Sequence, residues 1–173
     1  MALLRGINVG GKNKLPMATL AKIFADEKCV DVRTFIQSGN VIYDAPAKAA
    51  ATVGERVARR IEKELGLDVP VVVRAADELA AVPKRNPFKR AGENELHVMF
   101  LADAPTAAQA RALDPQRSPG DELALVGRDL YLRLPNGVGR TKITNAYVDR
   151  TLGTVSTGRN WRTVLKLIEL SAR

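Results

Sequence analysis

The apolar residues of this chain change period in a fixed order, and that order occurs twice. Strand-sized apolar runs alternate with segments in which apolar residues recur every three or four positions. In the first half, the pattern predicts strands at residues 2–7, 30–37, 41–44 and 69–74, and helices at 16–28 and 49–65. In the second half, it predicts strands at 97–101, 122–126, 130–134 and 154–156, and helices at 106–113 and 143–152. A short helix at 76–81 separates the halves, and an amphipathic helix is expected from residue 160.

This repeated order restricts the fold. Right-handed crossovers and short hairpins bring four such strands into one antiparallel sheet with both helices on one face. The sequence therefore predicts an α+β protein with two tandem ferredoxin-like subdomains (βαββαβ, the alpha-beta plait), antiparallel sheets and a C-terminal helix. Residues 83–94 are rich in proline and basic residues and are predicted to be a linker. The first subdomain is then residues 1–82, and the second is 95–173.

The chain is basic, with a net charge of +8. Residues 128–173 carry most of the imbalance. Such a field favours an anionic small molecule or nucleic acid as partner, although a basic surface with no nucleic-acid role fits equally well. The apolar runs are strand-sized, so no membrane partner is expected. No signal-peptide pattern opens the sequence, and the cytoplasm is the expected location. The oligomeric state is open.

Residues that commonly carry catalysis are scarce. His97 and Cys29 are the only histidine and cysteine, so neither a disulfide within the chain nor a zinc site made of several such ligands is expected. Both are predicted to be structural. No GxSxG motif or evident carboxylate pair is present. No cofactor or metal is expected, catalytic residues are unknown, and the sequence leans away from an enzyme. Phosphoryl chemistry resting on Arg and Lys stays open.

Two polar clusters fall in the first half. The first, residues 5–14, joins a strand to a helix and contains a glycine pair among basic residues. This combination suits a phosphate or carboxylate. It matches neither the Walker nor the GxGxxG spacing, so an ordinary connection is as compatible as an anion site. The second, residues 37–40, is a hairpin turn whose Gly and Asn are first explained by positive φ. Gln37 needs partners if it is covered.

A third cluster has two parts: residues 140–142 precede one predicted helix, and residues 157–163 open the last helix. Thr157 or Asn160 can cap the final helix. Arg159 and Arg162 are placed near its positive end, which is unfavourable unless an anion binds there. Trp161 is predicted to lie in the core. We expect the three clusters to converge in one basic groove between the subdomains. The predicted ligand-binding residues are Arg5, Asn8, Gly10, Gly11, Lys12, Asn13, Gln37, Ser38, Asn40, Lys142, Arg159 and Asn160.

Five stretches of this sequence resemble those of one uncharacterised bacterial family, known as domain of unknown function 1697. The stretches are LLRGINVGG (3–11), IQSGNV (36–41), NPF (86–88), KITN (142–145) and TGRNWRTV (157–164). The resemblance implies two ferredoxin-like subdomains. It brings no established activity, cofactor or catalytic residue.

Three functions are compatible with these observations. Binding of an anionic ligand, nucleic acid included, ranks first. It stands just ahead of an enzyme that uses the same groove. The third is a protein-interaction role through an open sheet face or an edge strand. RNA recognition by aromatic stacking is disfavoured, because the strand at 41–44 offers only Tyr43 as a stacking ring.

Overall fold

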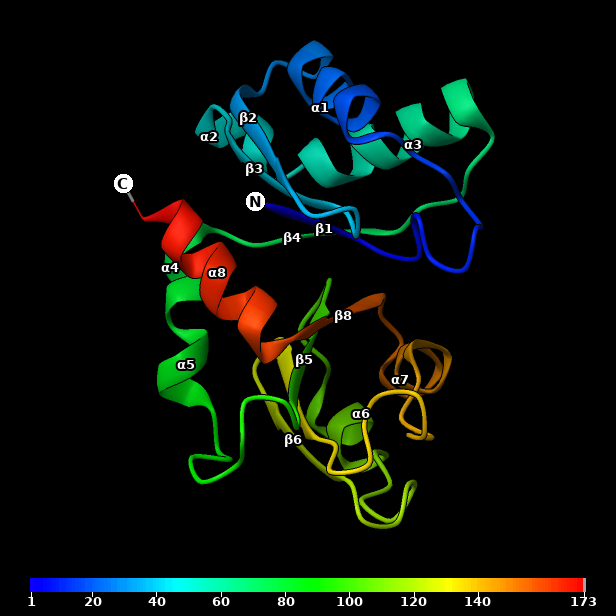
Figure 1. Ribbon diagram of the computed structural model, residues 1–173, viewed down its shortest axis with the longest axis vertical. Helices are drawn as coiled ribbons and strands as arrows, with labels where there is room; N and C mark the ends of the chain where they lie inside the picture. Colours follow the sequence, from blue (N-terminus) through cyan, green and yellow to red (C-terminus); the bar gives the residue numbers. More distant parts are fainter. Residues whose placement is uncertain (173) are drawn as a thin grey trace. The chain divides into compact units, whose positions relative to one another are not determined.

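The computed structural model describes residues 1–172 and divides the chain into two compact units. The first unit contains Met1–Ala76 and the C-terminal residues from Leu170 on, and the second contains Asp77–Glu169. Each unit has its own four-stranded antiparallel sheet, and the last helix is α8 (Trp161–Ser171) (Figure 1). The predicted α+β class with two antiparallel sheets is confirmed. No helix among the described residues is both long and apolar enough to span a membrane.

The first sheet has the strand order β2-β3-β1-β4, with every neighbouring pair antiparallel. Helices α1 and α3 lie on the same side of it (Figure 1). The elements of this unit are β1 (Ala2–Leu4), α1 (Met17–Asp26), β2 (Val30–Phe35), β3 (Asn40–Asp44), α2 (Ala47–Ala50), α3 (Val53–Leu65) and β4 (Val71–Val73).

The core of the first unit joins both helices to the sheet. Leu20 and Phe24 of α1 and Val57 of α3 are buried together with Ala2 and Leu4 of β1, among other apolar residues. The helices pack closely on the sheet, and Gly54 allows α3 to approach β4. A Cβ at Gly54 would lie 2.8 Å from Cγ2 of Val73 on β4. Burial of this apolar face is the main stabilising contribution.

Ion pairs of Arg56 with Glu27 and of Arg60 with Asp26 and Glu27 hold the C-terminal end of α1 against α3. Arg56 Nε lies 2.8 Å from Glu27, and Arg60 Nη2 lies 2.9 Å from Asp26. Arg60 also pairs with Glu64 one turn later on its own helix. The hydrogen bonds and charges of these carboxylates raise the pKa of Arg60.

The helix predicted at residues 49–65 is divided in the structure. Helix α2 begins after Pro46, and a turn at Ala51 and Thr52 separates it from α3. Thr52 donates its hydroxyl to the Ala49 carbonyl at 3.2 Å, a local side-chain bond that competes with a continuous helix. Helix α3 then ends at Gly66, with φ of +66°, as predicted.

The second sheet has the corresponding order, β6-β7-β5-β8, and is again antiparallel throughout. The elements from this part of the chain are α4 (Ala76–Ala80), α5 (Val82–Arg85), β5 (Leu96–Leu101), α6 (Ala107–Arg111), β6 (Glu122–Val126), β7 (Asp129–Arg133), α7 (Asn145–Leu152) and β8 (Ser156–Asn160).

Helices of the second unit contact both faces of its sheet. On one face, Met99 and Leu130 form a core with Tyr147 and Val148 of α7. On the other face, the Tyr131 hydroxyl donates to the carbonyl of Val82 in α5 at 2.9 Å. Because alternate strand residues point to opposite faces, α5 and α7 lie on opposite sides of this sheet.

The observed division of the chain differs from the predicted one. The units separate between Ala76 and Asp77 rather than after residue 82, and residues 83–94, expected to be a linker, belong to the second unit. This segment contains most of helix α5 and the buried side chain of Asn86. The prolines and charged residues of this segment correspond to turns and exposed side chains within the second unit, not to a linker between units.

The last strand also differs from its prediction. The sequence placed it at residues 154–156, whereas β8 is Ser156–Asn160 and pairs along its length with β5. Its residues, Ser-Thr-Gly-Arg-Asn, are polar and lack an apolar alternation, so the pattern did not show a strand.

Candidate functional site

Two segments of the first unit meet at the end of β1. We call residues 5–14 the glycine loop and residues 36–40 the hairpin turn. The Leu4 N–H donates to the Gly39 carbonyl at 2.8 Å, and Asn8 Nδ2 donates to the Gln37 carbonyl at 2.9 Å. The structure therefore brings nine of the twelve predicted residues together. They are Arg5, Asn8, Gly10, Gly11, Lys12, Asn13, Gln37, Ser38 and Asn40.

The glycine pair forms the tip of the glycine loop. Gly10 and Gly11 have φ of +58° and +76°, and the Lys12 N–H donates to the Val9 carbonyl at 3.1 Å. Positive φ at both central residues defines a two-residue hairpin turn of the type that glycine favours. Both glycines are exposed, and neither N–H bonds to any residue in the described part of the chain. Lys12 beside them is exposed as well.

Asn8 and Asn13 shape the glycine loop from within. Asn8 Nδ2 donates to the Leu15 carbonyl at 2.9 Å as well as to Gln37, and Asn8 Oδ1 accepts from the Leu15 N–H at 2.9 Å. Asn13 Nδ2 donates to the Gly6 carbonyl at 3.0 Å. Both residues have positive φ, which Asn tolerates. Their amides position the loop, in contrast to the predicted ligand contacts.

Asn40 has a similar structural role in the hairpin turn. Its side chain is fully buried, and Nδ2 donates to the Phe35 carbonyl at 3.0 Å and to Ser38 Oγ at 3.1 Å. Gln37 is exposed, so its side chain does not need the protein partners that a covered Gln37 would need. Of the other predicted side chains in this region, Arg5 is half-exposed and Lys12 is exposed, and the exposed Val9, Lys14 and Ile36 lie in the same two segments.

Three predicted residues, Lys142, Arg159 and Asn160, belong to the second unit. Lys142 lies before α7 with an exposed side chain. Asn160 Oδ1 accepts from the Thr163 N–H at 2.8 Å, so Asn160 caps α8 as predicted. That these residues join the glycine loop in one groove stays a prediction.

Arg159 does not open the final helix as predicted. It lies within β8, opposite Val98 of β5, and its side chain is buried. Nη1 donates to Thr157 Oγ1 at 2.9 Å and to the Gly158 carbonyl at 2.8 Å. Burial lowers the pKa of Arg159 to about 10, so the guanidinium stays charged at neutral pH. Arg162 is the arginine in the first turn of α8, and it is exposed.

The lone cysteine and histidine are in structural positions. Cys29 is buried, and burial raises the pKa of its thiol. His97 is half-buried in β5, with Nδ1 3.5 Å from the Glu95 carbonyl oxygen. Within residues 1–172, no group of three or more His, Cys, Asp or Glu side chains could hold a metal ion.

Stability should depend on pH through His97. Burial lowers its pKa in the folded chain, so the unfolded chain binds the proton more readily. The contribution of neutral His97 to the free energy of unfolding is fully present above the unfolded pKa of about 6.5. It is lost as the pH falls from there through the folded pKa. We expect the free energy of unfolding to fall more between pH 7 and pH 5 for the native chain than for His97→Gln. Equal slopes in urea titrations would contradict this.

Two of the hollows in the described part of the chain lie outside the predicted residues, each with a volume of about 390 Å³. One is on the first unit and is lined by Arg56, Arg60 and neighbours whose charges are largely paired with acids. The other is on the second unit and is formed partly by Pro87 and Phe88. The sequence signal for the second was the NPF stretch, to which no role had been assigned.

The fold and the glycine loop define a basic α+β protein with two antiparallel sheets and a polar loop surface. The chain belongs to the family described as "Protein of unknown function (DUF1697)", whose model matches residues 1–131. Three of the five stretches that carried the resemblance lie in this range. No curated protein matches the chain.

A solved structure has the same fold. It is that of the conserved bacterial protein SP0830 from Streptococcus pneumoniae, with a TM-score of 0.71 and 18% sequence identity. The match covers 99% of this chain and 97% of that chain. Since the similarity extends over nearly both chains, the two-sheet architecture belongs to the whole sequence, including the part beyond residue 131.

Proposed function

We propose that this protein binds an anionic ligand, such as a nucleotide, a phosphorylated metabolite or a nucleic acid, at the glycine loop. The observation that carries the proposal is the exposed Gly10–Gly11 turn with unbonded N–H groups beside Lys12. Backbone N–H groups in turns, together with cationic side chains, are a common way to bind phosphate.

The local charge supports this proposal. Arg5, Lys12 and Lys14 lie in the glycine loop, and the first acidic residue of the chain is Asp26. The hairpin turn beside the loop contains no acidic residue either. A phosphate at this surface would therefore meet positive charge without a competing carboxylate in either segment.

The hydrogen bonds of the glycine loop also support it. Asn8 and Asn13 hold the loop by their side-chain amides before any ligand arrives. A loop that is already ordered loses less conformational entropy on binding, so more of the contact energy appears as affinity.

We also propose that each unit has the ferredoxin-like fold. Its support is the strand order, in which the first strand of each unit lies between the third and the fourth, with antiparallel pairs throughout. An experimental structure with a different strand order in either unit would rule this out.

The test of the ligand proposal is the double variant Lys12→Gln/Lys14→Gln. Binding of a fluorescent single-stranded oligonucleotide is measured by anisotropy over a range of salt concentrations. If both lysines contact phosphates, the slope of log K against log salt should become less negative by about 1.4. Thermal shifts with nucleotides and inorganic phosphate cover the small-molecule case, because a ligand of the folded state raises Tm.

A matched control separates the site from net charge. Lys28→Asn/Lys48→Gln removes the same charge from two other exposed positions of the first unit and should leave the salt slope unchanged. If both double variants lose affinity equally, the protein attracts anions only through its overall charge. If the native chain shows neither oligonucleotide binding at low salt nor a thermal shift, the proposal fails.

A further inference from the structure

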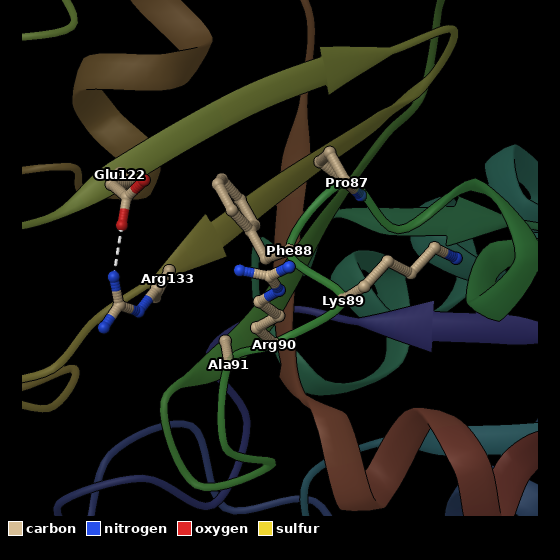
Figure 2. A pocket seen from close by; sticks show the side chains of 7 residues that line it. All are labelled: Pro87, Phe88, Lys89, Arg90, Ala91, Glu122 and Arg133. Atoms are coloured by element: carbon tan, nitrogen blue, oxygen red, sulfur yellow. Dashed lines mark hydrogen bonds and ion pairs between the residues drawn. The ribbon is translucent and has the colours of Figure 1, made fainter.

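The hollow on the second unit is built from one loop and one strand pair. Its lining residues are Pro87, Phe88, Lys89, Arg90, Ala91, Glu122 and Arg133 (Figure 2). Its volume of about 390 Å³ falls in the range of small-molecule sites, about 300–1,000 Å³. None of these residues belongs to the glycine loop, so this site is independent of the function proposed above.

The loop that carries Phe88 and Arg90 is held in place from both sides. The buried Asn86 accepts the Phe88 N–H on Oδ1 at 2.9 Å, which fixes a turn at Pro87. Lys89 Nζ donates to the carbonyls at the end of α5, Pro83 at 3.1 Å and Lys84 at 3.0 Å. Figure 2 shows the Lys89 side chain pointing away from the other lining side chains. Its ammonium is therefore used to anchor the loop.

The opposite wall of the hollow is formed by Glu122 and Arg133, which are ion-paired within the protein. Glu122 of β6 lies opposite Arg133 of β7 in the strand register, and Arg133 Nη1 donates to Glu122 (Figure 2). Arg133 Nε donates to Glu95 at 2.8 Å. These two carboxylates raise the pKa of Arg133. The charge of Arg133 is thus compensated by Glu95 and Glu122, and the charge of Glu122 is compensated by Arg133.

Arg90 is different from the other two cations. Its side chain is exposed and makes no hydrogen bond or ion pair to any residue in the range 1–172. Phe88, whose side chain also lines the hollow, is half-buried (Figure 2). A guanidinium offers a planar pair of donors to a carboxylate or phosphate, and an aromatic ring offers a flat apolar contact.

We propose that this hollow binds a small aromatic anion, with its anionic group on Arg90 and its ring against Phe88. The class of ligand follows from the lining side chains that are not already bonded within the protein. Arg133, Glu122 and Lys89 already have partners, so the charge available to a ligand is the cation of Arg90. The hollow has room for a single-ring molecule.

The test uses four probes with the intact protein labelled with nitrogen-15. Benzoate and phenyl phosphate carry both a ring and a charge, benzyl alcohol carries only the ring, and inorganic phosphate carries only the charge. We expect saturable shifts of the Phe88 and Arg90 amide signals with at least one aromatic anion, and about tenfold weaker binding without ring or charge. Comparing benzoate with phenyl phosphate identifies the preferred anionic group.

Variants decide whether Arg90 and Phe88 carry the binding. Arg90→Gln should weaken it about tenfold, because a charge-assisted hydrogen bond is lost. Phe88→Leu should weaken it several-fold while keeping the apolar bulk. Arg111→Gln, which removes an exposed arginine from α6, should leave it unchanged.

Three results would overturn the proposal: no aromatic anion binds, Arg90→Gln binds as well as the native chain, or the shifts map to the glycine loop. The Lys12→Gln/Lys14→Gln variant should bind the aromatic anion normally. This separates failure at one site from failure at the other.

Discussion

Gly39→Ala should destabilise the first unit by about 3 kcal/mol. Gly39 has φ of +78°, where an L-residue costs roughly 1–2 kcal/mol. Its new Cβ would lie 2.7 Å from Leu4 Cβ and 2.8 Å from Ile7 Cδ1. Both neighbours are fully buried, so relieving this contact requires the core to shift, at about 1–3 kcal/mol. Urea unfolding followed by circular dichroism measures the loss.

Gly66→Ala is the matched control for this prediction. Gly66 lies in the same unit with φ of +66°, but a Cβ there meets nothing within 4 Å. It should cost about 1 kcal/mol from backbone strain alone. Equal losses for the two variants would mean that crowding against Leu4 and Ile7 contributes nothing. The hairpin turn would then not be closely packed on β1.

Elements with strong local signals could be predicted from the sequence. Apolar runs predicted the strands at residues 122–126 and 130–134, which form the β6–β7 hairpin, and the helix end predicted at residue 65 is the end of α3. Strand β8 could not be placed, because its polar residues are held by pairing with β5 more than fifty positions earlier in the chain. Local patterns carry no information about such a partner.

The sequence indicated which residues of the two segments would lie together, but not which of their side chains have structural roles. The sequence grouped the glycine loop and the hairpin turn by their residue types. It could not show that the amides of Asn8 and Asn40 are turned inward to backbone carbonyls, because a side-chain amide suits a ligand and a backbone equally well. The sequence could not indicate the role proposed for Arg90 either, because the other wall of the hollow comes from β6 and β7.

The structural role of Asn8 gives the second large expected effect. Asn8→Gly keeps the positive φ but removes three hydrogen bonds, to Leu15 twice and to Gln37. At about 1 kcal/mol for each bond, the first unit should lose about 2–3 kcal/mol. The Leu15 amide, which donates to Asn8 Oδ1, should exchange with deuterium roughly tenfold to a hundredfold faster. Anion binding at the glycine loop should weaken too, because the ligand would then have to order the loop.

Asn13→Gly provides the comparison, because Asn13 also has positive φ but donates a single side-chain hydrogen bond, to the Gly6 carbonyl. It should cost about 1 kcal/mol and leave Leu15 exchange nearly unchanged. If Asn8→Gly cost no more than Asn13→Gly, and Leu15 stayed protected, Asn8 would not be the link between the two segments. Its side chain would then be available to a ligand, as the sequence alone had indicated. A larger cost at Asn8 means that the order of the glycine loop depends on the hydrogen bonds of the Asn8 side chain.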